Sequence, residues 1–527
     1  MTSGTKGLVT EPSSLGPVNV NDNIVAADVW GDEYRVVREA MDWAEARVVR
    51  ETDPKTTARS ADELRQAAGS TVCPEGIGGL AALRIFVDVL EPATRAQDDP
   101  MNLAYVPSAP TRASVAFDFV TSAANVFGGV WETGAGAIFA ENEALAWLIE
   151  LLGWPRTAGG CFVSGGTSGN LSALVAARET ALARRGSRPP GGWQLACTGE
   201  VHSSIRSAAK VLDVTVVDVP CDDRGRLTGA QLEPILRTHP DVFAVVATAG
   251  TTNAGLIDDL AGVADACKTH GVWMHVDGAY GGAGLAAPSV SALFEGVERA
   301  DSFIVDPHKW LFAPYDSCAL LYRDPAQARA AHAQSANYLD QIDREMWNPA
   351  DLAVHLSRRA RGLPFWFSLA THGTDRYSAA VERTLDTART VADAIRSSSH
   401  LELVCEPQLS VLLFRRVGWD SEAYQQWSQR MSREGVILCL PTTWHGETVL
   451  RLAFVNPATQ ARHVIEALET LRWAVGARPG PCRPPAEASR RVGDRPLGFL
   501  RACSGRRCSA LLPGPTWSQP CPGSGCR

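Results

Sequence analysis

Short apolar runs rich in β-branched residues alternate with longer stretches of helical spacing between about residues 160 and 325. The runs expected to be strands are 161–163, 194–197, 215–219, 244–248, 273–276, 302–305 and 318–322. Strands that alternate with helices form βαβ units, whose parallel strands are covered by helices on both faces. The pattern therefore predicts an α/β domain built on a mostly parallel sheet.

The pattern changes after about residue 376, where strands and helices no longer alternate one by one. Helices are expected at 379–397, 421–433 and 459–475, and strands at 411–414, 436–440 and 449–454. Strands that pair with each other beside separate helices are typical of an α+β arrangement. We therefore predict a second, small α+β domain over residues 376–478.

The segments before the sheet are expected to be mainly helical. Helical spacing occurs over 31–50 and 61–68, after a polar arm of about 25 residues. Two more apolar helices are expected between residues 115 and 152, on either side of a loop that contains Gly128, Gly129, Gly134 and Gly136. We assign 1–115 to an N-terminal arm with helices and 116–375 to the large domain.

The last 49 residues, 479–527, differ in composition from the rest of the chain. They contain nine prolines, seven glycines, five cysteines, and eight arginines against two acidic residues. Too few apolar residues recur there to bury a core, so this tail is expected to be disordered. Its cysteines match no recognised zinc spacing. We interpret the tail as an extension without function rather than as a site for metal or nucleic acid.

Composition and charge exclude several classes of function. With 527 residues, 45% of them hydrophobic, the chain is long enough for two or three domains with a large core. The net charge of −8 argues against nucleic acid as a main partner. There is no signal-like apolar start and no run of about 18 apolar residues, so we expect no membrane partner and a cytoplasmic location. The eight cysteines before the tail have no Cys-x-x-Cys spacing and are expected to be buried apolar residues, not metal ligands.

The candidate chemistry is concentrated at Lys309. An apolar run, 303–305, leads through Pro307 to this amine, which lies between His308 and Trp310. Burial favours the neutral form of an amine, so we expect a lowered pKa and a nucleophile toward carbonyl groups. From spacing alone, a lysine whose amine reaches solvent past Trp310 is the alternative. The chain has five lysines against 45 arginines, so a lysine kept at this position favours a chemical role.

The segment DSFIVDPHKWLFAPYDSCALLYR, residues 301–323, resembles the cofactor-lysine segment of the group II pyridoxal-phosphate-dependent amino-acid decarboxylases. This family includes aromatic-L-amino-acid, glutamate and diaminobutyrate decarboxylases, and the resemblance spans roughly residues 70–475. It implies a fold type I enzyme like aspartate aminotransferase, normally a homodimer, in which Lys309 holds pyridoxal 5'-phosphate and no metal is required. It also implies that the N-terminal helices pack across the partner subunit; from the sequence alone, packing on their own subunit is equally open.

A second stretch, residues 162–171, is expected to be a strand that ends in a Gly-rich turn and opens a helix over 171–184. The free backbone N–H groups of such a turn, together with nearby hydroxyls, suit a phosphate. Taken alone, such a turn more often only starts a helix. Its similarity to the phosphate loop of the family implies that Gly166, Thr167 and Ser168 bind the cofactor.

Asp277 follows the strand expected at 273–276, at the edge where α/β folds form ligand crevices. A carboxylate at the end of a strand often only caps a helix. In the resembling family this aspartate pairs with the pyridinium nitrogen of the cofactor and keeps it protonated, so that the ring accepts electrons. The 32 residues from Asp277 to Lys309 leave room for one crossover and a return strand.

Further cofactor-binding residues follow from the resemblance. His202 matches the histidine that stacks on the cofactor ring and helps with proton transfer at Cα, although a residue that only begins a helix is the alternative. Thr252 matches a position beside the cofactor, or else belongs to a turn that only connects a strand and a helix. Ala279 matches the small side chain under the ring, and His308 precedes the cofactor lysine.

Two positions bear on ligand charge. Asp306 stands where animal members of the family often carry Asn; a carboxylate there would repel phosphate unless it points away or is paired, so Asp306 is not assigned to the phosphate ligands. Arg451 matches the family arginine that can hold a ligand carboxylate in a bidentate pair. A surface arginine on a strand is the alternative. Aromatic, acidic and diamino substrates all stay open, with a slight lean toward a second carboxylate.

The expected reaction is decarboxylation of an L-amino acid to its amine and CO2, with Lys309, His202 and Asp277 as catalytic residues. In the family, a tyrosine on a mobile loop protonates Cα. Within residues 326–360 the only tyrosine is Tyr338, which precedes the expected loop at 341–351. An aldehyde synthase or another pyridoxal-phosphate-dependent lyase is therefore the alternative reaction. A catalytically silent binding subunit is a third hypothesis, which the joint presence of the site residues disfavours.

Overall fold

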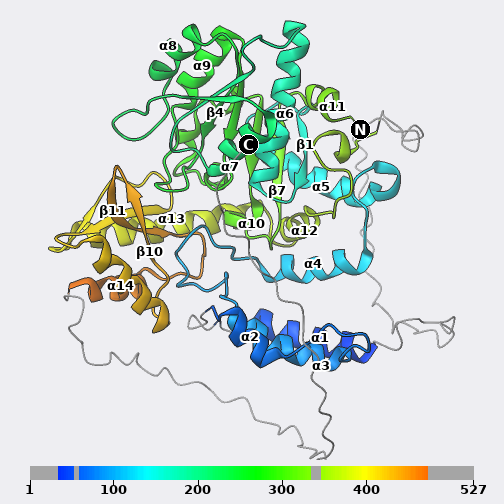
Figure 1. The fold of residues 1–527 in the computed structure, drawn as a ribbon, viewed down its shortest axis with the longest axis vertical. Coiled ribbons are helices and arrows are strands. Elements are labelled where there is room, and N and C mark those ends of the chain that lie inside the picture. The colour runs from blue at the N-terminus through cyan, green and yellow to red at the C-terminus, as the bar shows by residue number, and fades with distance from the viewer. Residues whose placement is uncertain (1–33, 51, 53–57, 334–345, 473–527) are drawn as a thin grey trace, which may run out of the picture. The chain divides into compact units, whose positions relative to one another are not determined.

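The computed structural model describes residues 34–50, 52, 58–333 and 346–472 (Figure 1). All of them belong to one unit, Met1–Gly476, within which the predicted domain boundaries stay predictions. The second unit, Ala477–Arg527, lies outside the described residues, and so do the predicted disordered tail and Tyr338.

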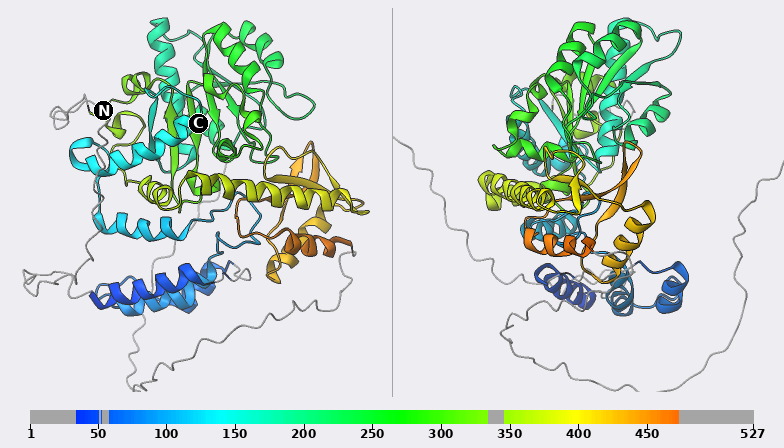
Figure 2. Two further views of the ribbon diagram at one scale, coloured as in Figure 1. Left: turned by 180° about the vertical axis from the view of Figure 1, so that it is seen from behind. Right: turned by 90° about the vertical axis from the view of Figure 1, so that its left-hand side faces the viewer.

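A seven-stranded sheet forms the centre of the fold (Figure 2). Its strands are β1 (Gly159–Val163), β2 (Gln194–Cys197), β3 (Thr215–Asp218), β4 (Val242–Thr248), β5 (Trp273–Asp277), β6 (Ser302–Val305) and β7 (Cys318–Tyr322). They lie in the order β1-β7-β6-β5-β4-β2-β3, and of these only β7 runs antiparallel to its neighbours, β1 and β6. The mostly parallel sheet is confirmed, with every predicted strand in place.

Helices precede, connect and follow the strands. They are α1 (Tyr34–Val49), α2 (Ala61–Ala68), α3 (Gly79–Ile85), α4 (Arg112–Ala124), α5 (Trp131–Leu151), α6 (Gly166–Arg185), α7 (Ser203–Leu212), α8 (Gly229–Thr238), α9 (Leu260–His270), α10 (Pro307–Trp310), α11 (Pro325–His332), α12 (Leu363–His372), α13 (Thr374–Arg396), α14 (Ser421–Arg433) and α15 (Ala461–Glu469). Several boundaries differ from the prediction; for example, α13 starts at Thr374 rather than at 379, and α15 ends at Glu469 rather than at 475. The helix expected at 171–184 already starts at Gly166, and Gly134 lies at a kink inside α5 rather than in a loop.

Alternate residues of the strands point to opposite faces of the sheet and enter two different cores. On one face, Val246 and Ile304 pack with apolar residues of α6 and α7. On the other face, Val245 and Phe303 pack with apolar residues of α5, α8, α9 and α13. Burial on both faces explains why these strands appear in the sequence as continuous apolar runs rather than as alternating ones.

A smaller antiparallel sheet follows, in the order β10-β11-β9-β8. Its strands are β8 (Leu401–Leu403), β9 (Val411–Arg416), β10 (Leu440–Trp444) and β11 (Glu447–Ala453). They share a core with α13, α14 and α15, which confirms the α+β pattern. The strand predicted at 436–440 was wrong, because Leu438 instead exchanges backbone hydrogen bonds with Met101 and Leu103 and β10 begins only at Leu440.

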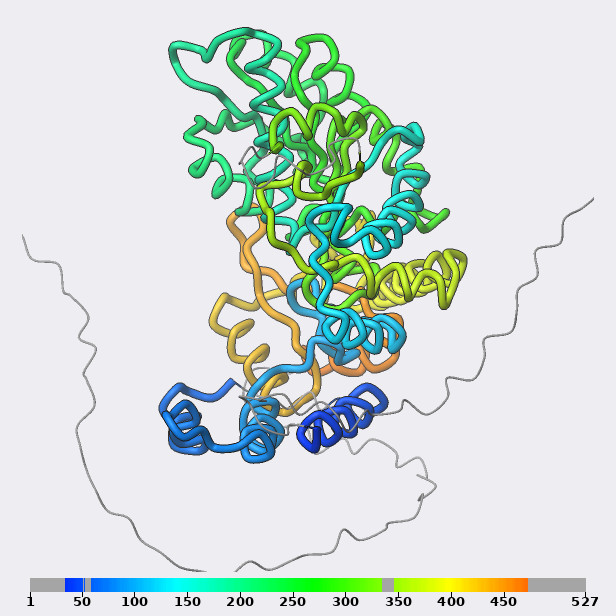
Figure 3. The backbone as a smooth tube through the Cα atoms, turned by 90° about the vertical axis from the view of Figure 1, so that its right-hand side faces the viewer, coloured from blue at the N-terminus to red at the C-terminus, as the bar shows by residue number. Residues whose placement is uncertain are grey.

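The N-terminal helices α1, α2 and α3 lie together at one end of the described fold (Figure 3). None of their residues is buried within this chain. Several large apolar side chains on α1 and on the segment after α3 are exposed, among them Tyr34, Val37, Met41, Phe86 and Leu90. These exposed apolar side chains are therefore available to pack against another surface.

The structure tests what the sequence predicted for the cysteines and for helices that could cross a membrane. Five cysteines are buried, namely Cys161, Cys197, Cys267, Cys318 and Cys439. The prediction was wrong for Cys73, Cys221 and Cys405, which are partly exposed. Among the described residues, no helix combines the length and the apolar character that crossing a membrane would need.

Candidate active site

The candidate site lies where the parallel strands of the large sheet end. Gly166 follows β1, His202 follows β2, Thr252 follows β4 and Asp277 is the last residue of β5. The carboxyl ends of parallel strands meet at one edge of a sheet, so these residues come together although they are far apart in the sequence. Because β7 is antiparallel, its beginning lies at the same edge, and the connection from β6 to β7 carries Lys309 there.

A cavity of about 320 Å³ occupies this edge. The predicted cofactor-binding residues that line it are Gly166, Thr167, His202, Thr252, Asp277, Ala279, His308 and Lys309. Ser168 is not among the residues that line the cavity; its hydroxyl lies 2.9 Å from the hydroxyl of Ser164. The fold therefore brings the predicted residues to one cavity, except that the hydroxyl of Ser168 faces Ser164.

Lys309 forms an ion pair with Asp306. Its Nζ lies 2.9 Å from Oδ2 of Asp306, a carboxylate that is only 2% exposed. Burial is the largest single influence on the pKa of Lys309 and lowers it, but the charge of Asp306, its hydrogen bond and the charge of Asp277 together outweigh burial, so the pKa lies above its usual value. The predicted fall in this pKa was therefore wrong for the protein without a bound ligand. The prediction took account of burial but not of the Asp306 carboxylate, which lies one helical turn away.

Asp306 is correspondingly held in its charged form. Burial raises the pKa of Asp306. The charges of Lys309 and His308, with hydrogen bonds from Cys318 and Lys309, together lower this pKa by more than burial raises it. The pairing meets the condition under which a carboxylate can lie near a phosphate without repelling it.

Asp277 is fixed through both carboxylate oxygens. Oδ1 accepts a hydrogen bond of 3.0 Å from the backbone N–H of Ala279, and Oδ2 accepts one of 2.9 Å from the side-chain amide of Asn170. Tyr280, not Asp277, is the N-cap of the short helical turn Gly281–Ala286 that follows. The structure therefore does not support the alternative that Asp277 only caps a helix.

His202 is the N-cap residue of α7, and its Nδ1 accepts a hydrogen bond of 3.2 Å from the backbone N–H of Ser204. The sequence alternative, a histidine that begins a helix, is thus correct as a description of its place. The same ring also lines the cavity. Capping orients the imidazole, so the two descriptions are compatible.

Further residues that line the cavity were not predicted as site residues, among them the polar side chains of Asn170, Tyr315 and Asp316. All three stand inside stretches that had been singled out for other residues. Tyr315 packs against His308, with ring centroids 4.8 Å apart. Nδ1 of His308 lies 2.6 Å from the carbonyl oxygen of Ser317, at the start of β7.

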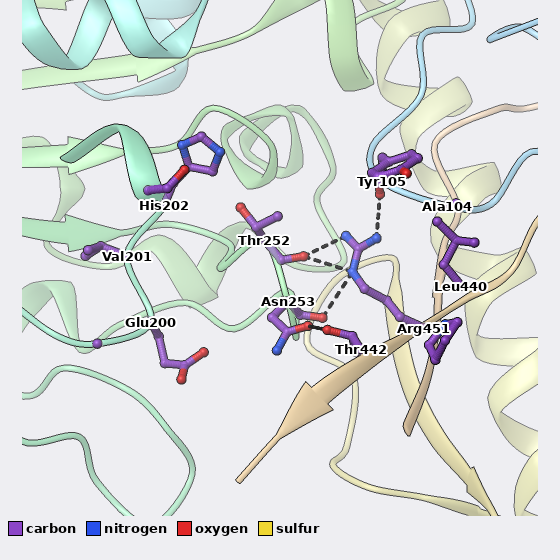
Figure 4. A pocket seen from close by; sticks show the side chains of 13 residues that line it. Ala104, Tyr105, Glu200, Val201, His202, Thr252, Asn253, Leu440, Thr442 and Arg451 are labelled. Carbon is purple, nitrogen blue, oxygen red and sulfur yellow. Dashed lines mark hydrogen bonds between the residues drawn. The ribbon is translucent and has the colours of Figure 1, made fainter. Parts of the chain in front are cut away.

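A second cavity of about 400 Å³ adjoins the first and shares His202 and Thr252 with it (Figure 4). Polar and charged residues that line it are Tyr105, Glu200, Asn253, Thr442 and Arg451. They come from the loops after β2 and β4, from the segment before α4 and from the small sheet.

Arg451 connects these parts. Nε and Nη2 donate to the carbonyl oxygen of Thr252, at 2.9 and 2.6 Å, and Nη1 donates to that of Tyr105, at 2.5 Å (Figure 4). The residue is only 8% exposed, so the alternative of a surface arginine was wrong. Burial lowers its pKa to about 10. Its binding of a ligand carboxylate stays a prediction, because main-chain carbonyls already engage each of its three nitrogens.

The residues of the first cavity fit pyridoxal 5'-phosphate. The N-cap residue of α6 is Gly165, and no side chain caps the helix there. Backbone N–H groups at this end are therefore available for a phosphate. A Cβ on Gly166 would lie 3.2 Å from Oδ2 of Asp306 and 3.3 Å from Cβ of Ala279, so the backbone there is closely surrounded. Asp277 supplies a carboxylate for a ring nitrogen, and Lys309 supplies an amine for an aldehyde. Within the described part of the chain, no cluster of His, Cys, Asp and Glu could hold a metal ion.

Comparisons with known proteins agree with this geometry. The family described as "Pyridoxal-dependent decarboxylase conserved domain" matches residues 83–417. An aromatic-L-amino-acid decarboxylase of Bacillus atrophaeus is 30% identical over 71% of this chain and 81% of its own length. An L-2,4-diaminobutyrate decarboxylase of Rhizobium meliloti (strain 1021) is 30% identical over 85% of this chain and 93% of its own length.

The fold is also similar to solved structures. The crystal structure of Oryza sativa TDC with PLP and tryptamine superposes with a TM-score of 0.76 at 25% identity, covering 85% of this chain and 98% of that one. The fold is therefore that of a fold type I pyridoxal-phosphate enzyme, as expected. With the sequence match and the cavity, it follows that the chain belongs to the group II pyridoxal-phosphate-dependent decarboxylase family.

Proposed function

We propose that the protein is a pyridoxal-phosphate-dependent carboxy-lyase that converts an L-amino acid to its amine and CO2. The observation that carries the proposal is the lining of one cavity by an amine, Lys309, and a carboxylate, Asp277, beside an uncapped helix N-terminus. These are the three groups that the aldehyde, ring nitrogen and phosphate of the cofactor need. When bound, the cofactor supplies an electron sink for the carbanion left by loss of CO2.

The residues of the chain have separate roles in this proposal. Gly166 and Thr167, at the start of α6, hold the phosphate, while Ser168 supports the turn through Ser164. Asp277 keeps the ring nitrogen protonated. Lys309 anchors the cofactor before and after each turnover. His202, with Thr252 and Ala279, covers the ring, and His202 delivers a proton to the substrate Cα.

The second cavity takes the substrate side chain. It adjoins the cofactor cavity through His202 and Thr252, so an amino acid bound there has its α-carbon near the proposed proton donor. The carboxylate of Glu200 and the guanidinium of Arg451 both line it, and Arg451 is already engaged by carbonyl oxygens. Aromatic, acidic and diamino substrates are the classes to compare.

The test is the visible spectrum of the purified protein after incubation with pyridoxal 5'-phosphate, beside that of Lys309→Ala. We expect a band of bound cofactor that Lys309→Ala lacks, and CO2 with amine from one class among the twenty amino acids, 2,4-diaminobutyrate and DOPA. Lys268→Ala, which removes an exposed lysine, is the matched control and should keep the band. A wild-type protein without any band would favour a silent binding subunit and overturn the proposal.

A second candidate reaction is oxidative and is favoured by the loop sequence: with O2 as the oxidant and one water, the amino acid gives an aldehyde, CO2, ammonia and hydrogen peroxide. Residues 341–351 contain no tyrosine, and Trp347 is the aromatic residue there. In the structure, Nε1 of Trp347 donates to the carbonyl oxygen of Gly160, at 3.2 Å, so this indole packs on β1. Equal amounts of ammonia and CO2, with aldehyde in place of amine, would identify this alternative.

We also propose a homodimer in the cytoplasm. The support is the absence of buried residues in α1, α2 and α3, whose exposed apolar side chains a second copy of the chain would cover. Sedimentation at micromolar concentration should give twice the mass of 56.4 kDa. A double change, Val37→Glu with Met41→Glu, should give monomers, whereas a wild-type monomer would contradict the dimer. Cell fractionation tests the location.

A further inference from the structure

Buried polar side chains form a row of hydrogen bonds around Asn170, which lines the first cavity. From the sequence, no chemical role was assigned to Asn170, Ser204, His275 or Ser302. Asn170 on α6 is 1% exposed and reaches side chains on two other elements, β5 and α7. Its Nδ2 lies 2.9 Å from Oδ2 of Asp277 and 3.0 Å from Oγ of Ser204, and its Oδ1 lies 2.8 Å from Nε2 of His275.

The direction of these hydrogen bonds follows from the chemistry of the partners. A charged carboxylate can only accept, so the nitrogen of the Asn170 amide must face Asp277 and the oxygen must face His275. Nε2 of His275 therefore carries a hydrogen and donates it to Asn170. The second N–H of the amide is donated to Ser204.

The other side of His275 is consistent with this assignment. Nε1 of Trp273 donates to Oγ of Ser302, at 2.8 Å, because an indole nitrogen can only donate. The hydroxyl hydrogen of Ser302 is then free for Nδ1 of His275, which lies 2.8 Å away. His275 is fully buried, and burial lowers its pKa to about 4, so the ring stays neutral with its hydrogen on Nε2.

The chain of donors continues to the ring of His202. Oγ of Ser204 accepts from Asn170, so its own hydrogen is donated to Nδ1 of His202, at 2.8 Å. The backbone N–H of Ser204 donates to the same nitrogen. Nδ1 thus acts only as an acceptor, and a neutral His202 carries its hydrogen on Nε2.

We propose that Asn170 is a positioning residue that links Asp277 and His202, the two side chains proposed to contact the cofactor ring, and that His275 fixes the orientation of its amide. The inference rests on the proposed function, because it takes Asp277 and His202 as groups that contact the ring of pyridoxal 5'-phosphate. One amide donates to Asp277 and, through Ser204, sets the tautomer of His202. Each of the five side-chain hydrogen bonds from Trp273 to His202 has a donor fixed by the chemistry of the groups along the row.

Asn170→Asp tests the link to Asp277. The change keeps the volume and an acceptor for His275 but removes both donors, and it places a second carboxylate beside Asp277. Loss of a charge-assisted hydrogen bond predicts an affinity for pyridoxal 5'-phosphate lower by about 10- to 100-fold at pH 8. The loss should shrink at pH 6, where the introduced carboxyl is protonated and can donate. A purely structural role would give no such pH dependence.

The readout is equilibrium binding of pyridoxal 5'-phosphate to the cofactor-free protein, followed by its visible absorbance from pH 6 to pH 9. Competition by inorganic phosphate should be unchanged within about twofold, which assigns the effect to the ring rather than to the phosphate. Asn456→Asp is the matched control, since Asn456 is another buried asparagine, which donates to the carbonyl oxygen of Asp98. It should bind like wild type.

A second pair of variants covers the case in which Asn170→Asp does not fold. His275→Gln keeps a donor for Asn170, and His275→Leu removes it at similar volume. We expect Gln to bind the cofactor within about threefold of wild type and Leu to bind about tenfold more weakly. Equal affinities for these two variants would overturn the role of His275.

Ser204→Ala tests the branch to His202 alone. Cofactor affinity should stay within about threefold of wild type, while kcat falls about tenfold and its pH profile shifts. An unchanged pH profile would overturn this branch. Wild-type binding and pH dependence in Asn170→Asp would overturn the inference and leave the proposed function intact. If the wild-type protein binds no cofactor, the proposed function itself fails.

Discussion

Nζ of Lys309 lies 2.9 Å from Oδ2 of Asp306, three residues earlier on the connection between β6 and β7. The pair is charged on both sides, because the pKa of Lys309 is raised and that of Asp306 is lowered. An amine held as ammonium is not a nucleophile, so this contact restrains Lys309 until a carbonyl ligand arrives.

Asp306→Asn should therefore make Lys309 more reactive in the cofactor-free protein. Without the Asp306 carboxylate, burial, the largest influence on the pKa of Lys309, is opposed mainly by the charge of Asp277, so the pKa falls. Each unit of fall gives about tenfold more neutral amine at pH 8. The pH dependence of the rate of reaction with pyridoxal 5'-phosphate measures this. Asp316→Asn is the control, since Asp316 lines the same cavity but pairs with Arg361. A rate unchanged at every pH would contradict the restraint.

Gly166→Ala should weaken cofactor binding. The new Cβ would lie 3.2 Å from Oδ2 of Asp306, closer than ordinary contact, at the first turn of α6. We expect the dissociation constant for pyridoxal 5'-phosphate to rise about tenfold, which corresponds to about 1.4 kcal/mol. Gly136→Ala, in α5, meets nothing within 4 Å and should bind as wild type does. Equal affinities in both variants would remove Gly166 from the phosphate site.

The contribution of His275 to the free energy of unfolding should fall as the cofactor-free protein is acidified below about pH 6.5. His275 has a pKa of about 4 when folded, with burial as the largest cause, and Asp277 is the charged group that acts on it. Between these values only the unfolded chain binds the proton, so stability is lost as pH falls, by about 2 kcal/mol at pH 5. Chemical denaturation at pH 7 and pH 5 measures the difference, which His275→Gln should reduce by about that amount. A variant with the same pH slope as wild type would assign the loss to other groups.

Arg451→Lys should lower the stability of the protein as well as its activity. A lysine cannot reach the carbonyl oxygens of Thr252 and Tyr105 together, and a buried carbonyl left unpaired costs about 1–3 kcal/mol. Urea unfolding measures the loss, and Arg462→Lys, at an exposed position of α15, should change stability by less than about 0.5 kcal/mol. A raised KM with unchanged stability would instead favour direct contact with the substrate carboxylate.

Glu141→Gln should be the most destabilising of these changes. Both oxygens of Glu141 accept from Nη2 of Arg358, at 2.7 and 2.8 Å, and the two side chains are 3% and 1% exposed. Removing one partner leaves a buried charge, which costs about 3–5 kcal/mol. Asp62→Asn, in an exposed pair with Arg65, serves as the control and should cost less than about 1 kcal/mol. A small loss at Glu141 would mean that water reaches Arg358.

The large sheet could be predicted from the sequence because burial on both faces leaves a continuous apolar signature in each strand. The strand expected at 436–440 could not, since Leu438 pairs with Met101 and Leu103, more than 300 residues earlier in the chain. A pattern within a short window carries no information about such a remote partner.

The candidate site, too, could be predicted from the sequence only in part. The segments of Lys309, Asp277 and the turn at Gly166 were identified from local sequence and resemblance, and the fold brings them to one cavity. The raised pKa of Lys309 and the network of Asn170 were not foreseen. Both depend on distances between side chains, and Asn170 is separated from Asp277 by 107 residues.

The single antiparallel strand of the large sheet has a consequence for how the protein can diversify. Lys309 is borne on a connection whose two ends, β6 and β7, are paired with each other in the middle of the sheet. The residues around the second cavity come instead from loops and from the smaller sheet. If the second cavity takes the substrate side chain, as proposed, changes in substrate preference can accumulate at the periphery without displacing Lys309, so that the chemistry is inherited with the core and selectivity with the surface.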